Sequence, residues 1–179
     1  MMNQNVKLWL RAANPFTPPR GMAEAQRAAR MGAVALGLEA LSSAASSIRM
    51  IAYPDYMRNL MSRQFEQMQL SAKELEFQMA LFETMRPMMA LFSLGFVVLM
   101  AFVTVVQWRK MTRIIPVIML IYFGYSIVAT VGVFSVGLFP RGALDGWAMF
   151  NWALYAILLL PVIAAYRGAT ALERLKRTS

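Results

Sequence analysis

Reactive side chains are scarce in this sequence. Its 179 residues contain no cysteine and no histidine, which excludes thiolate and imidazole metal sites, cysteine nucleophiles and histidine-containing catalytic triads. Serine–lysine chemistry is formally available, but Lys73 is expected on a solvated helix face and Lys110 in a basic loop. Neither lysine has an evident serine partner in a buried cleft. We therefore expect a protein that is not an enzyme and holds no metal or cofactor.

One carboxylate stands inside a long apolar stretch. Residues 31–50 read "MGAVALGLEALSSAASSIRM", with Glu39 near the middle and four serines after it. An acidic residue within a membrane is costly and usually functional, whereas a carboxylate on a solvated helix face needs no special role. The interpretation of Glu39 therefore depends on whether this stretch crosses a membrane.

The composition is typical of a membrane protein. The chain is 59% hydrophobic and 15% charged, whereas soluble domains are about 45–50% apolar and about 25% charged. The net charge is +9, and the basic residues flank apolar runs, where they set membrane topology. We expect contact with the lipid bilayer, with anionic head groups near the basic loop and tail, and no nucleic acid.

Three runs are long enough to cross a bilayer, which takes about 20 residues. They are Pro87–Trp108, Ile114–Phe139 and Gly146–Tyr166, and none contains Asp, Glu, Lys or Arg. Coupled ion carriers usually keep ionisable residues in their spans, so this absence argues against coupled transport. Pro161, inside the third run, predicts a kink.

A heptad pattern precedes the spans. The Tyr53–Pro54 break predicts a helix from Asp55 to Arg86, in which apolar residues recur at steps of four and three, as in a coiled coil. This helix is expected to pack against another helix or a partner. The candidate partner-packing residues are Met61, Phe65, Met68, Leu75, Met79 and Phe82.

Residues 31–50 show the same spacing through Met31, Val34, Leu38, Leu41, Ala45 and Ile48. Glu39 and most of the serines fall on the other side of the helix. We expect an amphipathic hairpin over residues 21–86, its two apolar seams facing each other or another subunit. Insertion of residues 31–50 alone is disfavoured, because the larger apolar residues contribute about −1.5 to −3 kcal/mol and a central charge costs about +2.5 to +3.5 kcal/mol.

The resulting prediction is an all-α integral membrane protein with three transmembrane helices preceded by the amphipathic hairpin. Residues 1–20 form an N-terminal segment that is either an interfacial anchor or a frayed end, 87–166 the transmembrane region, and 167–179 a basic tail. Positive charge places the loop 109–113 and the C-terminus in the cytoplasm. Three spans then put residues 1–86 outside without an evident signal peptide. A fourth span at residues 31–52 would remove this conflict, and so would a cytoplasmic hairpin whose partners override the charge rule.

Two classes of function fit these features. The first is a non-enzymatic membrane scaffold or accessory subunit that packs into a larger complex or homo-oligomer through its methionine-rich seams. The alternative is a homo-oligomeric channel, a holin-like pore or a carrier for neutral or lipid-like solutes. Its selectivity would come from the size of the pore and from hydroxyl and carbonyl groups that line it.

Overall fold

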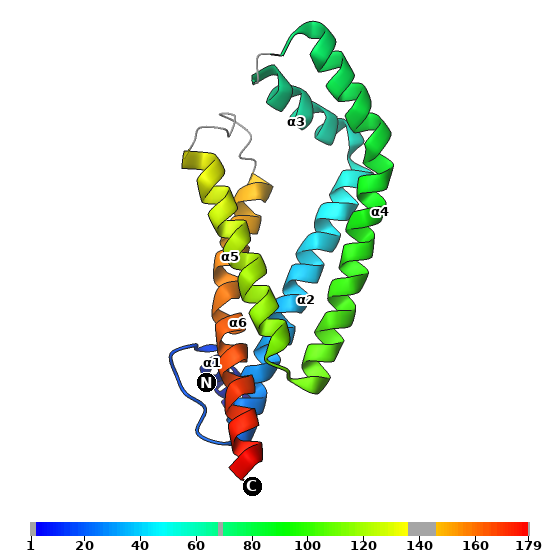
Figure 1. The fold of residues 1–179 in the computed structure, drawn as a ribbon. Helices are drawn as coiled ribbons and strands as arrows, with labels where there is room; N and C mark the ends of the chain where they lie inside the picture. Colours follow the sequence, from blue (N-terminus) through cyan, green and yellow to red (C-terminus); the bar gives the residue numbers. More distant parts are fainter. Residues whose placement is uncertain (1–2, 68–69, 136–145, 179) are drawn as a thin grey trace.

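The protein is all-α. The computed structural model describes residues 3–67, 70–135 and 146–178, and its regular structure there is helical. Both termini lie at one end of an elongated bundle, here called the terminal end, and α3 lies at the other (Figure 1). The described helices are α1 (Gln4–Ala13), α2 (Met22–Ala52), α3 (Pro54–Gln67), α4 (Ala72–Lys110), α5 (Ile114–Ser135) and α6 (Gly146–Thr178).

Four of these helices, α2, α4, α5 and α6, are long and apolar enough to span a membrane. Three of them contain the spans predicted from the sequence. The fourth is α2, so the described residues hold four candidate spans, and the predicted arrangement of three spans plus a hairpin is not confirmed. The end of the second predicted span, residues 136–139, lies outside the described residues.

Helix α4 runs unbroken through Pro87 for 39 residues, or about 58 Å at the α-helical rise. It ends at Met111, whose left-handed backbone (φ 51°) lets its N–H bond to the Gln107 carbonyl. Helix α5 then begins with Pro116 in its first turn, where a missing N–H costs little. These two ends make a tight reversal between antiparallel helices.

Helix α2 is the centre of the bundle, since it makes the most extensive contacts with α6 and with α4, while α5 packs on α6. Small residues allow α2 and α6 to approach closely. A Cβ atom placed on Gly168 would lie 2.5 Å from the backbone nitrogen of Ala29, and one on Gly32 would lie 2.9 Å from the Ala165 Cβ. Close backbone contact between small residues is a common way to pack helices in membranes.

The predicted helix from Asp55 to Arg86 is two helices, α3 and α4. A capping box separates them: the Ser71 hydroxyl accepts from the Glu74 N–H at 3.4 Å, and the Glu74 carboxylate accepts from the Ser71 N–H at 2.8 Å. This arrangement starts a new helix, which the apolar periodicity alone does not reveal. Helix α3 contacts the first part of α4, so the observed hairpin is α3–α4 (Figure 1).

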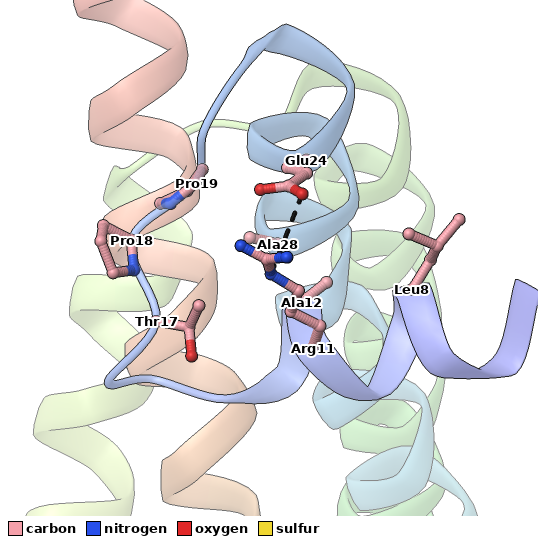
Figure 2. Close-up of a pocket in the computed structure, with 8 residues that line it drawn as sticks. All are labelled: Leu8, Arg11, Ala12, Thr17, Pro18, Pro19, Glu24 and Ala28. Atoms are coloured by element: carbon pink, nitrogen blue, oxygen red, sulfur yellow. Dashed lines mark ion pairs between the residues drawn. The ribbon is translucent and has the colours of Figure 1, made fainter. Parts of the chain in front are cut away.

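Helix α1 packs against the terminal end of the bundle. Its Trp9 ring stacks on the Trp108 ring at 6.2 Å, and Arg11 pairs with Glu24 at 3.9 Å. Figure 2 shows α1, the proline-rich loop and the start of α2 around a cavity of about 10 Å³, which has room for about one water. The N-terminal segment is therefore joined to α2 by side-chain contacts, with Leu10 left exposed.

Candidate functional site: the buried polar face of α2

The polar side of α2 faces the inside of the bundle, the reverse of the orientation expected from its sequence pattern. Glu39 is 1% exposed, whereas Leu41 and Ile48 are 68% and 62% exposed. The serines Ser42 and Ser47 are buried with Glu39. A helix surrounded by lipid turns its apolar residues outward and its polar residues towards neighbouring helices, and that is the arrangement of α2.

Glu39 has hydroxyl partners on one carboxylate oxygen. Its Oε1 accepts from the Ser43 hydroxyl at 3.2 Å and lies 3.5 Å from the Tyr155 hydroxyl. Its Oε2 is buried and has no hydrogen-bond partner among the described residues. On the same helix, Arg30 and Arg49 lie nine and ten positions away, about 14 and 15 Å along the axis. No ion pair to Glu39 is found in the described part of the chain.

Two aromatic rings of α5 pack against the Tyr155 ring of α6 and hold its hydroxyl beside Glu39. The Tyr155 ring packs edge-on to Tyr122 at 6.3 Å and against Phe123 at 5.5 Å. Phe123 is fully buried. Such pairs favour defined relative orientations, so the hydroxyl is positioned by packing as well as by its hydrogen bond.

Hydroxyl groups continue from Glu39 towards the α3 end of the bundle. Ser42 donates to Asn151 Oδ1 at 2.6 Å, and the Trp147 indole N–H donates to Ser46 at 3.0 Å. Nearer the α3 end, the hydroxyls of Ser47 and Ser93 lie 2.5 Å apart. These contacts, here called the serine ladder, join α2 to both α6 and α4.

The other direction from Glu39 is apolar and tightly packed. Towards the terminal end, the buried positions of α2 are Leu36 and small residues from Ala35 down to Ala25. Among the described residues, Gln107 Nε2 on α4 donates a hydrogen bond to the Ala29 carbonyl in this part of α2, at 3.0 Å. Polar side chains are therefore more numerous on the α3 side of Glu39 than on its terminal side.

The site offers one carboxylate and several hydroxyls, and no group of three metal-ligating side chains is found among the described residues. A carboxylate with hydroxyl donors can hold a proton or a small cation. The sequence pattern predicted that Glu39 lies on a solvated helix face. The one feature of the sequence that pointed to burial was the position of Glu39 within a run long enough to span a membrane.

The predicted partner-packing residues lie on two neighbouring helices. Met61 and Phe65 are on α3, and Leu75, Met79 and Phe82 are on α4; Met68 lies outside the described residues. The first four are half-buried and Phe82 is buried. Because α3 contacts α4, we infer that contacts between these two helices cover part of the predicted partner-packing surface.

Comparisons with known proteins identify no relative of this chain. No protein-family model, no curated protein and no solved structure matches it.

Proposed function

We propose that the chain crosses the membrane four times, with α2 as the first span. Both termini and the loop 109–113 lie in the cytoplasm, and α3 lies on the other side. The arrangement in Figure 1 supports this topology, because the terminal end carries α1, the α4–α5 reversal and the C-terminus together. A fourth span also removes the conflict between positive charge and the position of residues 1–86.

The charge distribution favours this orientation, since basic residues near span ends stay in the cytoplasm. Within the terminal end, Glu24 and Glu173 are the acidic residues, paired with Arg11 and Arg113. Each basic side chain near the membrane surface also attracts anionic head groups by about 1 kcal/mol. The basic residues there are Lys7, Arg11, Arg20, Arg27, Arg30, Arg109, Lys110, Arg113, Arg167, Arg174, Lys176 and Arg177.

Within this topology, the protein acts as a non-enzymatic subunit that pairs with a second copy of itself through the outer face of α4. The observation that carries this proposal is a row of exposed residues at heptad spacing, here called the α4 seam. Its steps of four and three continue for four heptads, as in a coiled coil. The α4 seam comprises Phe77, Leu81, Thr84, Met88, Leu91, Gly95, Val98, Phe102 and Val105, all exposed.

Lipid contact explains only part of the α4 seam. A hydrocarbon core of about 30 Å takes about 20 residues of helix, so a core that begins at Trp108 ends near Met88. Phe77 and Leu81 lie beyond that point, on the same turns as charged residues such as Glu76. Exposed apolar side chains outside the lipid are typical of an interaction surface.

A second copy fits this surface. Gln78, Ala80, Met85 and Pro87 flank the seam in its outer part and are uncharged, so two copies would meet without like-charge repulsion. A Cβ on Gly95 would have nothing within 4 Å, which leaves room for another helix to approach closely. Because the membrane orients both copies alike, a two-fold axis along its normal brings each seam residue to its own counterpart.

Disulfide cross-linking tests this pairing, since the sequence has no cysteine. Leu81→Cys, Leu91→Cys and Val98→Cys should each give a linked dimer on mild oxidation in native membranes. The matched control is Val128→Cys on α5, which is 70% exposed but lies outside the seam. Equal cross-linking at Val128, or a monodisperse monomer in mild detergent, would contradict the pairing.

A second candidate function, a carrier for lipid-like solutes, is favoured by one observation. An apolar groove of about 330 Å³ lies between α4 and α5, lined by Phe96, Leu99, Met100, Phe102, Val103, Val106, Ile115, Ile118, Met119 and Tyr122. Its size and lining suit an acyl chain. Photolabelling by a fatty-acid probe that is lost in Val103→Trp would support this function. Labelling unchanged by that variant would oppose it.

A further inference from the structure

We propose that Glu39 is a reversible proton-binding site that exchanges with the α3 end of the bundle and not with the terminal end. The inference goes beyond pairing through α4 and does not depend on it. It rests on the burial of the carboxyl group and on the one-sided distribution of polar groups around it.

The buried carboxyl group of Glu39 needs a bound proton to offset the cost of its burial. Glu39 is 1% exposed, and Oε2 has no partner in the described part of the chain. The titratable groups that face it are Tyr155 on α6 and Tyr122 on α5, and both are neutral hydroxyls. Helix α4 has no titratable side chain between Arg86 and Arg109. An uncompensated carboxylate is far more costly to bury than a neutral acid, so a proton on Oε2 removes most of this cost.

Polar side chains mark a route for the proton between Glu39 and the α3 end. The serine ladder places the hydroxyls of Ser42, Ser46 and Ser47 between Glu39 and the α3 end. A cavity of about 200 Å³ between α5 and α6 also reaches Tyr155 and is lined by the hydroxyl residues Ser126 and Thr130. Proton relays in membrane proteins use carboxyl and imidazole side chains, and hydroxyl groups can extend such a path because each both donates and accepts a hydrogen bond.

The opposite route is tightly packed. Gly32 lies against Ala165, and Gly168 lies against the backbone of Ala29, with no room for even one added methyl group in the second contact. A proton would have to pass Leu36 and a run of buried alanines, where the Gln107 amide is the neighbouring side chain that bonds to α2 among the described residues. This close packing disfavours exchange through the terminal end.

Proton binding is a simple transfer. A proton from water at the α3 end bonds to Oε2 and leaves a neutral acid, and the reverse step returns it to water and restores the carboxylate. Because α2 contacts both α4 and α6, the two charge states change the polarity at the centre of both contacts. The site can thus couple proton concentration on the α3 side to the packing of α2, as buried ionisable groups do in other switches.

Infrared titration of the protein in liposomes tests the proton. Exposed carboxyl groups are ionised above about pH 6, so a protonated carboxyl band at neutral pH reports a buried group. This band should be present in the native protein and in Glu76→Gln, absent in Glu39→Gln, and shifted in frequency in Tyr155→Phe, which keeps Glu39. A band absent at neutral pH, unchanged in Glu39→Gln, or displaced by Na⁺ at constant pH would overturn the proposal.

Cysteine accessibility tests the direction. Ser46→Cys lies on the serine ladder, and Ala33→Cys is the matched control on the terminal side of Glu39. A small membrane-impermeant thiol reagent added on the α3 side should modify Ser46→Cys at least tenfold faster than Ala33→Cys. Equal rates, or faster modification of Ala33→Cys, would overturn one-sided exchange.

Discussion

Replacing Gly168 by alanine tests the central contact of the fold. The added Cβ would lie 2.5 Å from the Ala29 nitrogen, 2.7 Å from the Ala28 Cβ and 2.8 Å from the Ala28 carbonyl carbon. Two of these atoms are backbone, so no side-chain rotation can relieve the overlap. Reaching ordinary van der Waals contact requires α2 and α6 to separate by about 1 Å, and overpacking of this kind costs about 1–3 kcal/mol.

Other glycines supply a graded control series. A Cβ on Gly32 would meet the Ala165 Cβ at 2.9 Å, whereas one on Gly37 would have only an ordinary contact at 3.8 Å, and one on Gly124 would have no neighbour within 4 Å. Alanine is a better helix former than glycine by about 1 kcal/mol. Gly37→Ala and Gly124→Ala should therefore leave the stability unchanged or raise it. The stability of Gly32→Ala should lie between that of these two variants and that of Gly168→Ala.

The assay is reversible unfolding in mixed micelles, followed by circular dichroism or tryptophan fluorescence. We expect the free energy of unfolding to be highest for Gly124→Ala, lower for Gly32→Ala and lowest for Gly168→Ala. If Gly168→Ala matches Gly124→Ala, then α2 does not pack closely on α6, and the reasoning about the core of the bundle fails.

Two smaller predictions concern the caps and the N-terminus. Hydrogen bonds from the Ser71 hydroxyl and N–H lower the pKa of Glu74, so its cap is fully present above the ordinary carboxyl pKa and is lost as pH falls through the lowered value. The protection of the amides of residues 72–74 against hydrogen exchange, relative to their intrinsic rates, should therefore fall at acid pH, and it should be reduced at every pH in Ser71→Ala. Trp9→Ala removes the stack on Trp108, worth about 0.5–1.5 kcal/mol, and should speed tryptic cleavage at Arg20. The control Leu10→Ala, which changes an exposed residue of the same helix, should not, and equal cleavage in both would contradict a role for the stack.

The sequence predicted an all-α architecture with three apolar spans, but it did not predict how α2 faces its neighbours. A period near 3.6 residues identifies two faces of a helix without saying which one is buried. The insertion estimate treated residues 31–50 as an isolated helix, whereas Ser42 and Ser47 have partners on α6 and α4. Those contacts come from residues more than 45 positions away, and nothing in the local pattern shows them.

The break before α4 was readable in principle. Ser71 and Glu74 have the spacing of a capping box, but the heptad pattern continues across the break and predicted one helix. Glu39 was recognised as the residue that would matter if α2 crossed the membrane. Its contact with Tyr155, 116 positions away, required the structure.

The most direct test of the account is whether α2 crosses the membrane. Two single-cysteine variants bracket it, Asn5→Cys in α1 and Ser62→Cys in α3, and each is labelled in intact cells with an impermeant maleimide. The four-span topology predicts that Ser62→Cys is labelled from outside and that Asn5→Cys is labelled only after permeabilisation. Labelling of both from the same side would show that α2 does not cross, and would contradict both the four-span topology and a membrane-buried Glu39.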